Sequence, residues 1–198
     1  MRVSVLDPAA YTPPYDRALC AALARAGAQV ELLTAAFAHG EVPAADGFAV
    51  REDFYRWAPS GRGRRAARLA SHVPDMLLAA RRPADVVHFQ WLAVQQLDQL
   101  LVRAFRRPRV LTAHDVLPRE ARPGQRAGQR RLYDAMDAVV VHSRHGRERL
   151  VAELGVDAAR VHVIPHGILR PVGDAPLPPE LPRFDGPVAL CFGLLRPY

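Results

Sequence analysis

Val139-Val140-Val141-His142-Ser143 is a run of β-branched residues that ends at a polar pair, and a helical pattern from Arg144 to Leu154 follows it directly. A buried strand that leads straight into a helix is the repeating unit of α/β proteins. Three other apolar runs end at or next to a histidine, which predicts the same unit several times along the chain. They are Val86-Val87-His88, Leu111-Thr112-Ala113-His114 and Val161-His162-Val163-Ile164-Pro165-His166.

The chain alternates between such strands and helices over most of its length. Because the strands are apolar on both faces, they predict a parallel sheet that is covered by helices. The sequence thus predicts an α/β protein with a Rossmann-like, doubly wound parallel sheet. Strands are predicted at 2–6, 29–34, 85–89, 109–113, 138–142 and 161–164, an extended segment at 48–57, and helices at 15–26, 64–80, 92–105, 125–136 and 144–154.

The composition changes after His166. Six prolines follow within 171–187, which predicts a stiff interdomain linker without regular structure. A fresh apolar run then starts at Val188, and the sequence reaches Tyr198 before a helix can follow. We therefore expect a Rossmann-like domain at 1–170, a Pro-rich linker at 171–187, and at 188–198 the first strand of a second, incomplete domain.

All 27 basic residues are arginines, and the formal net charge is +7. Two arginine-rich stretches, 51–82 and 103–131, would attract phosphates on nucleic acids, anionic lipid headgroups or nucleotide-linked substrates, although solvated helix faces are the simpler explanation. The predicted helix 64–80 interleaves arginines with apolar residues such as Leu69, Val73, Met76 and Leu77, and Pro74 interrupts or kinks it. Its apolar side either packs on the sheet or lies on an anionic membrane.

No stretch approaches eighteen consecutive apolar residues, and the short apolar N-terminus turns acidic at Asp7, unlike a signal peptide. The sequence therefore predicts a cytoplasmic protein whose membrane contact, if any, is peripheral. Cys20 and Cys191 lie in apolar contexts and are interpreted as buried thiols in a reducing compartment.

The histidines that end parallel strands should share the carboxyl edge of the sheet, where open α/β sheets bind their ligands. Neighbouring strands lie about 4.8 Å apart, so His88, His114 and His142 are a candidate zinc site. A carboxylate or cysteine at defined spacing, which usually completes such a site, does not accompany them in the sequence. A metallohydrolase and a polyanion-binding α/β module without catalysis are the two alternatives from other functional classes.

Four segments together resemble the N-terminal, acceptor-side half of a family 4 glycosyltransferase. They are LTAHDVLP (111–118), AVVVHS (138–143), VIPHGI (163–168) and FGLLRPY (192–198). Such enzymes have the two-domain GT-B fold and transfer a sugar from a nucleotide diphosphate with retention of anomeric configuration. The resemblance implies a nucleotide-sugar donor, a glycan, lipid-linked or small-molecule acceptor, no metal cofactor and no specific nucleic-acid partner. The donor-side groups would lie beyond Tyr198, so the 198 residues alone are not expected to turn over.

The resemblance also implies roles for individual residues. His114 is expected to face the donor sugar at the reaction centre, where the transition state needs preorganised hydrogen bonds. Asp115 follows it and either orients His114 or forms an Asx turn before Pro118. His166 and Gly167 are expected to line the cleft at the hinge between the domains, where glycine permits a close approach of the backbone.

Ser143 directly precedes the predicted helix 144–154, so its hydroxyl is predicted to cap the helix N-terminus. That N-terminus, with Arg144 in its first turn, can also hold an anion such as the donor phosphate. His142 is predicted to be structural, because adjacent strand residues point to opposite sides and only one of His142 and Ser143 can face the cleft.

The loop after the first strand departs from the glycine-rich pattern of the family. Residues 7–16 contain no glycine, and their three prolines lack the amide that would bind a phosphate. We therefore expect this loop to contact the acceptor, through Tyr11 and Tyr15. His88, Gln90 and Trp91 are predicted to form a second acceptor surface, because an aromatic ring beside polar groups suits a sugar or a lipid headgroup, although Trp91 could equally belong to the core.

Overall fold

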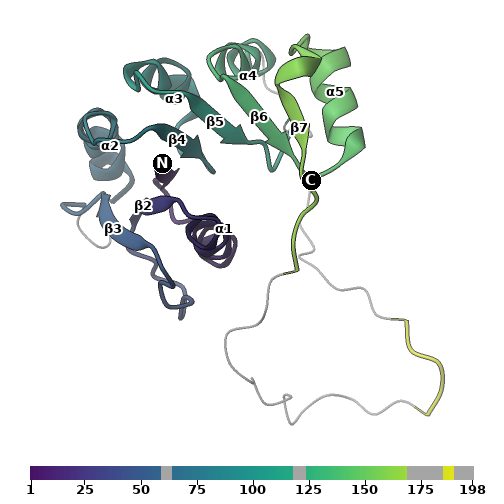
Figure 1. Cartoon of the computed structure of the whole chain (residues 1–198), viewed down its shortest axis with the longest axis horizontal. Helices are drawn as coiled ribbons and strands as arrows, with labels where there is room; N and C mark the ends of the chain where they lie inside the picture. The colour runs from purple at the N-terminus through teal and green to yellow at the C-terminus, as the bar shows by residue number, and fades with distance from the viewer. Residues whose placement is uncertain (59–63, 118–123, 169–184, 190–198) are drawn as a thin grey trace.

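The computed structural model describes residues 1–58, 64–117, 124–168 and 185–189 of the chain. Its centre is a seven-stranded sheet in which every strand runs parallel to its neighbours (Figure 1). The strands are β1 (Arg2–Asp7), β2 (Gln29–Ala35), β3 (Ala49–Phe54), β4 (Val86–Phe89), β5 (Arg109–Thr112), β6 (Ala138–Val141) and β7 (Val161–Val163). The helices are α1 (Pro13–Arg25), α2 (Arg64–Ala80), α3 (Gln95–Leu101), α4 (Gln125–Asp134) and α5 (Arg144–Leu154), with short 3-10 turns at Val102–Ala104 and Ala158–Arg160.

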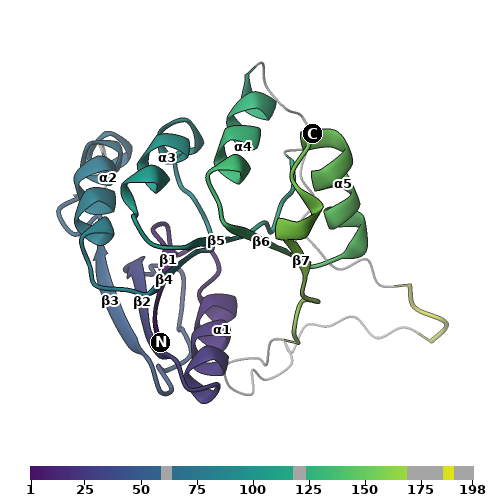
Figure 2. The ribbon, with the colours of Figure 1, turned by 45° about the horizontal axis from the view of Figure 1, so that its top comes forward.

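The strand order β3-β2-β1-β4-β5-β6-β7 changes direction next to β1. Strands β2 and β3 follow on one side of β1, and strands β4 to β7 follow on its other side. Helices α2 to α5 cover one face of the sheet and α1 covers the other (Figure 2). This confirms the predicted Rossmann-like, doubly wound sheet. Ligands of such sheets bind outside the carboxyl ends of the strands, at the switch point that lies here between β1 and β4.

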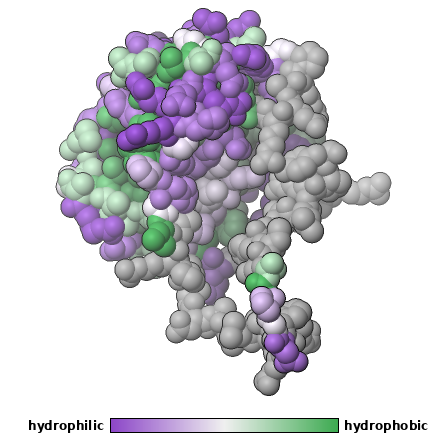
Figure 3. All heavy atoms as spheres, turned by 90° about the vertical axis from the view of Figure 1, so that its right-hand side faces the viewer, coloured by the Kyte–Doolittle hydropathy of each residue, from purple (hydrophilic) through white to green (hydrophobic). Residues whose placement is uncertain are grey.

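In the described part of the chain, no helix is both long enough and apolar enough to cross a membrane. The face drawn in Figure 3 carries mostly hydrophilic residues with smaller hydrophobic patches between them. The apolar residues of α2 differ in exposure: Met76 is buried, whereas Leu69 is 51% and Leu77 is 40% exposed. The helix itself continues across Pro74. Packing against the sheet therefore uses only part of its apolar residues.

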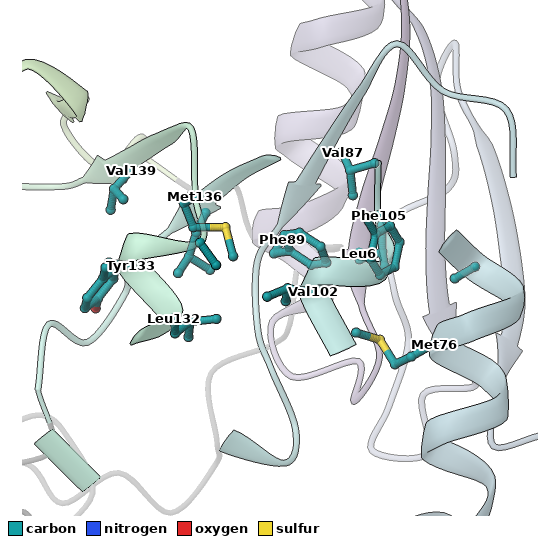
Figure 4. Packing of buried hydrophobic residues seen from close by; sticks show 14 of the residues in the cluster. Leu6, Met76, Val87, Phe89, Val102, Phe105, Leu132, Tyr133, Met136 and Val139 are labelled. Atoms are coloured by element: carbon teal, nitrogen blue, oxygen red, sulfur yellow. The ribbon is translucent and has the colours of Figure 1, made fainter. Parts of the chain in front are cut away.

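The main core lies between the sheet and the helices on the side of α2 to α5 (Figure 4). Alternate strand residues such as Leu6, Val87 and Phe89 point into it, and the ring of Phe89 meets that of Phe105 edge-on at a centroid distance of 5.1 Å. Burying each such side chain stabilises the fold by roughly 1.5–3 kcal/mol. Residues in or next to the helices close this core: Met76, Val102, Leu132, Tyr133, Met136, Leu150 and Leu154.

A smaller core lies between α1 and the opposite face of the sheet, where Val5 of β1 packs against Cys20. Cys20 is buried, as predicted, and burial raises the pKa of its thiol to about 12. Strand side chains alternate between the faces, and the register pairs Val5 with His88 and His88 with Val110. His88 and Thr112 therefore lie on the α1 face of the sheet.

Three helices differ from their predicted bounds, and one predicted region is barely described. Helix α4 ends at Asp134, before the predicted end at 136. Helix α1 begins at Pro13, because proline fits the first helical turn, where its missing N–H needs no partner. The helix predicted at 92–105 is the shorter α3 followed by a 3-10 turn. The predicted linker at 171–187, the second-domain strand at 188–198 and Cys191 lie outside the described residues, except for 185–189, which form neither helix nor strand.

Candidate functional site

Three histidines follow neighbouring strands at the carboxyl edge, and we call them the imidazole row. His114 follows β5, His142 follows β6 and His166 follows β7, with ring centroids 5.2 Å apart for the first pair and 5.0 Å for the second. The ring of Tyr15, from α1, packs against His114, His142 and His166 at centroid distances of 4.9, 5.5 and 5.0 Å. The alignment expected from the strand ends therefore holds for three of the four histidines.

His88 does not belong to the imidazole row. It lies inside β4, which continues to Phe89, and its Nε2 atom is 2.8 Å from Oγ1 of Thr112. Burial lowers the pKa of His88 to about 4, so its ring is neutral at physiological pH. The expectation that His88 shares an edge loop with Gln90 and Trp91 is not met, because the strand turns His88 toward the α1 face instead.

His114 is held on two sides. Its ring stacks on that of Trp91 with centroids 4.6 Å apart and 6° between the planes, and its Nε2 atom donates to Oε1 of buried Gln90 at 3.1 Å. Burial is the main cause that lowers the pKa of His114 to about 4, and the neighbouring histidines lower it further. His114 is therefore a neutral imidazole whose Nδ1 atom carries a lone pair.

Asp115 does not orient His114. Its side chain is exposed and has no hydrogen-bond partner within the described residues, while its backbone carbonyl accepts the hydroxyl of Tyr133 at 3.4 Å. The alternative Asx turn would end at Pro118, which lies outside the described residues. Gln90 therefore takes the orienting role that the sequence suggested for Asp115.

His142 is fixed by the neighbouring strand end. Its Nδ1 atom donates to the backbone carbonyl of Ile164 at 2.9 Å, and its Nε2 atom is buried without a partner among the described residues. His142 thus has the structural contact that was predicted, but it also belongs to the imidazole row. Ser143 caps α5, since its Oγ accepts the N–H of Gly146 at 3.0 Å, which confirms the predicted N-cap.

The other predicted cleft residues are exposed at the same edge. Arg144 begins α5, whose first turn contains no acidic residue, so the positive end of the helix dipole stays uncompensated by side chains of that turn. At the end of the row, Nδ1 of His166 donates to the carbonyl of Gly167 at 2.7 Å. The N-terminus of α5 is therefore the group at this edge that is best suited to an anion.

The loop after β1 turns its amides inward. The carboxylate of Asp7 accepts the N–H groups of Ala9 at 3.2 Å, Tyr11 at 2.5 Å and Thr12 at 3.3 Å, while the N–H of Ala10 donates to the backbone carbonyl of Asp7 at 3.1 Å. Every amide from residue 9 to residue 12 therefore has an internal partner. The glycine-free loop offers none of these four N–H groups to a donor phosphate.

Two buried carboxyl groups lie beneath this loop. Asp7 and Asp16 are almost fully buried and are hydrogen-bonded to each other. Burial, together with the charge of Asp7, raises the pKa of Asp16 to about 9. Asp16 therefore keeps its proton at neutral pH and donates it to Asp7, which in turn fixes the loop. No pattern in the sequence indicates this pair.

Tyr11 and Trp91 join the first loop to the loop after β4. Their ring centroids are 4.5 Å apart, and the indole N–H of Trp91 donates to Oγ1 of Thr12 at 2.8 Å. Tyr11 is 60% exposed, so its ring forms a surface at the carboxyl edge. Tyr11 and Trp91, which were expected on two separate acceptor surfaces, are thus in contact, while Tyr15 lies against the imidazole row.

Two cavities adjoin this group of rings. One of about 200 Å³ is lined by His114, Gln90 and Tyr133, and one of about 580 Å³ is lined by Tyr11 and Trp91. A larger cavity of about 700 Å³ lies at the amino edge of the strands. Because open α/β sheets place their ligands at the carboxyl edge, the two smaller cavities are the better candidates for substrate binding.

Within the described ranges, no three His, Cys, Asp or Glu side chains are placed to hold a metal ion together. His88, His114 and His142 each hydrogen-bond another protein group instead. The zinc site considered for these three histidines is therefore not formed by their present arrangement.

The family described as Glycosyltransferase Family 4 matches residues 17–168 of the chain. That span contains most of α1, the imidazole row and strands β2 to β7. Among curated protein sequences, none matches the chain significantly.

Three solved structures share the fold at low sequence identity. The UDP-GlcNAc 2-epimerase from Methanocaldococcus jannaschii has a TM-score of 0.56 at 10% identity, with 82% of this chain and 45% of that chain covered. Sucrose-phosphate synthase from Thermosynechococcus elongatus has a TM-score of 0.56 at 14% identity, with 83% and 48% covered. UGT89C1 from Arabidopsis thaliana, complexed with UDP-L-rhamnose, has a TM-score of 0.50 at 15% identity, with 87% and 53% covered. The chain spans about half the length of each of these three.

Proposed function

The chain belongs to glycosyltransferase family 4, with the Rossmann-like fold of the N-terminal half of a GT-B enzyme, and from this premise we propose its part in the reaction. It forms the acceptor-side half of a cleft in which a sugar passes from a nucleotide diphosphate to an acceptor with retention of configuration. The names of two fold relatives include UDP-sugars, which supports a nucleotide sugar as the donor. Glycosyl transfer needs no metal in this proposal.

The observation that carries the proposal is the neutral, preorganised imidazole of His114. Positive charge develops on the sugar ring as the bond to the diphosphate breaks, and a protonated histidine beside it would repel that charge. The low pKa of His114, about 4, keeps the ring uncharged. Trp91 and Gln90 hold its plane before substrate binds, so the hydrogen bond to the sugar costs little reorganisation.

The donor diphosphate is expected nearer to β6 and β7 than to β1. The four amides of the first loop are already occupied, whereas the N-terminus of α5, with Ser143 as its cap and Arg144 in its first turn, suits an anion. His166 and Gly167 border the same edge and would contact the donor at the hinge. The Gly-free loop then serves the acceptor through the ring of Tyr11.

The acceptor is proposed to lie against Tyr11, Tyr15, Gln90 and Trp91. An exposed tyrosine ring next to an indole offers the apolar faces on which sugars and headgroups pack, with polar groups close by for orientation. His88 would act on this site only through Thr112, as a positioning residue. Peripheral contact of α2 with an anionic membrane is part of the proposal for a lipid-linked acceptor, supported by the exposure of Leu69 and Leu77.

The test uses the natural full-length protein that contains these 198 residues. UDP-, GDP- and ADP-sugars are offered with and without EDTA, release of the nucleoside diphosphate is measured, and the anomeric proton of the product is read by NMR. We expect release from one donor class, unaffected by EDTA, and a product with the configuration of the donor. Steeply salt-dependent nucleic-acid binding without release from any donor would instead favour the polyanion-binding module.

A further inference from the structure

The cavity of about 580 Å³ at the carboxyl edge has a lining unlike that of the rest of the site. Aromatic and aliphatic side chains form most of its wall, and its charged lining residues in the described part of the chain are Arg65 and Arg68, both from α2. Trp91 lines this cavity and also stacks on His114. A ligand in the cavity is therefore separated from the imidazole row by one aromatic ring.

Neither arginine of this cavity is neutralised. Arg65 is exposed and Arg68 is half-buried, and neither guanidinium has an ion-pair or hydrogen-bond partner among the described residues. Arg82, just beyond the end of the same helix, is in contrast bound to the carboxylate of Glu31 at 2.9 Å. Two uncompensated cations on a largely apolar wall attract an anionic group.

Arg68 is held in place by the ring of Tyr55. Its guanidinium carbon lies 4.3 Å from the ring centroid, a stacking arrangement that keeps the planar group oriented while its N–H donors remain available. The backbone of Tyr55 has a φ of 58°, in the left-handed region that bulky residues avoid, and its N–H donates to Asp75 at 2.9 Å. Strain of this kind persists where the surroundings fix it and is concentrated at functional positions.

A buried chain of hydrogen bonds fixes Tyr55 from its other end. Its hydroxyl donates to Nδ1 of His72 at 2.8 Å, and Nε2 of His72 donates to Asp98 at 2.6 Å. Asp98 also accepts the N–H of Val94 at 2.7 Å, and Val94 lines the cavity. His72 and Asp98 are fully buried. Tyr55 is therefore held at its amide, its hydroxyl and its ring face, and it acts as a rigid support for Arg68.

We propose that this cavity binds a phosphate group of the acceptor, with Arg68 and Arg65 as the phosphate-binding residues and Tyr55 as the residue that positions Arg68. The inference rests on the proposed function, since it names the chemical class of its acceptor: a phosphate ester whose uncharged part packs on Tyr11 and Trp91. A planar guanidinium matches two phosphate oxygens at once. The reacting hydroxyl of such an acceptor would reach past Trp91 to His114.

The test measures binding of four probes to the 198-residue chain by isothermal titration calorimetry, without any donor. Octyl phosphate below its micelle concentration, glucose 1-phosphate and inorganic phosphate carry the anion, and octyl glucoside is the neutral reference. At least one ester should bind more tightly than both octyl glucoside and inorganic phosphate. Arg68→Ala should weaken that binding about tenfold or more, as expected for a lost charge-assisted hydrogen bond, and Arg65→Ala several-fold.

Matched variants separate site binding from general charge and from misfolding. Arg81→Ala removes an exposed arginine that follows α2 and lies outside the cavity, and it should change the affinity less than about twofold. Tyr55→Phe keeps the ring under Arg68 but removes the hydroxyl that binds His72, so it should lose less affinity than Tyr55→Leu, which lacks the ring and should lose affinity several-fold. Arg68→Lys keeps the positive charge but not the planar guanidinium, so its affinity should lie between those of Arg68→Ala and the wild type.

Either ester supports the inference, and their ranking identifies the source of the phosphate. Tighter binding of octyl phosphate indicates a lipid-linked acceptor, and tighter binding of glucose 1-phosphate indicates a soluble sugar phosphate. Equal affinities in the wild type and Arg68→Ala, or equal losses in Arg68→Ala and Arg81→Ala, would overturn it. Because no donor is present, an inactive transferase leaves this result standing, and an active transferase without phosphate binding overturns this inference alone.

Discussion

The indole of Trp91 lies parallel to the imidazole of His114, with ring centroids 4.6 Å apart and 6° between the planes. This stack excludes water from one face of His114 and connects it to Tyr11 of the first loop. The ring at the proposed reaction centre is therefore kept neutral and oriented by a side chain that also belongs to the proposed acceptor surface.

Removing the indole should raise the pKa of His114. In Trp91→Ala the imidazole becomes exposed, so we expect its pKa to move from about 4 toward the unperturbed value near 6.5. NMR titration of the histidine ring protons measures this directly. Trp57 is 88% exposed and serves as the control, since Trp57→Ala should leave the pKa of His114 unchanged. An unaltered pKa in Trp91→Ala would show that the stack does not desolvate the ring.

The buried pair of Asp7 and Asp16 predicts a pH dependence of stability. Folded Asp16 keeps its proton up to about pH 9, whereas an unfolded aspartate loses it near pH 4, so the folded protein binds the extra proton in this window. The stabilisation is complete below pH 4 and is lost as the pH rises toward 9, by up to about 1.4 kcal/mol per pH unit. Asp16→Asn has no proton to lose and can still donate to Asp7.

Urea unfolding of the wild type and Asp16→Asn at pH 5, 7 and 9 checks this pair. As the pH increases, the free energy of unfolding of the wild type should fall relative to that of Asp16→Asn. Parallel pH profiles for the two proteins would mean that Asp16 is ionised in the folded state.

The cap of α5 makes a simple prediction about stability. Ser143→Ala removes the acceptor for the N–H of Gly146 and should lower the free energy of unfolding by about 1 kcal/mol. Ser143→Asn, which provides another good capping oxygen, should be close to the wild type. Thermal unfolding of the three proteins gives the comparison, and an equal loss in both variants would argue for a role of the hydroxyl other than capping.

The buried hydrogen-bond chain through Asp98 should contribute more to the free energy of unfolding than surface ion pairs do. Asp98→Ala leaves His72 and the N–H of Val94 without their partner in a fully buried place, and we expect a loss of roughly 3 kcal/mol or more in the free energy of unfolding. Asp85 pairs with Arg2 at the surface, where water screens the charges, so Asp85→Ala should lower the free energy of unfolding far less than Asp98→Ala. Chemical unfolding measures both variants. Similar losses in Asp98→Ala and Asp85→Ala would show that the buried hydrogen bonds stabilise the fold no more than the surface ion pair does.

The alternation of strands and helices along the chain and the position of His114 follow from the sequence, because both depend on local patterns. Apolar runs followed by helical patterns predicted six of the seven strands, with only an extended segment where β3 forms, and the carboxyl ends of parallel strands had to meet at one edge. The position of His88 was predicted less well. The predicted strand 85–89 already contained this histidine, but the sequence did not show that the strand turns its side chain toward the α1 face and not into the edge loop.

The supports of the site depend on contacts between distant residues, which no local pattern reveals. Tyr55, His72 and Asp98 come from three different parts of the chain and meet only after α2 and α3 have packed. The inward amides of the first loop depend on Asp7, which looks like an ordinary loop carboxylate until its burial is known. Absence of glycine in that loop was the one signal in the sequence, and it correctly indicated that its amides are not offered to a phosphate.

The most direct test of the proposed reaction compares His114, which follows β5, with His162, which lies within β7. His114→Ala and His162→Ala are introduced into the full-length protein, and the rate of sugar transfer from its nucleotide-sugar donor is measured at saturating donor. His162 is exposed on β7 and lies outside the imidazole row, so its removal should leave the rate nearly unchanged. Loss of a preorganised hydrogen bond at the reaction centre lowers rates by about 10²–10³-fold, and we expect that loss in His114→Ala. If the His114→Ala protein transferred sugar as fast as the His162→Ala protein, His114 would have no role at the reaction centre.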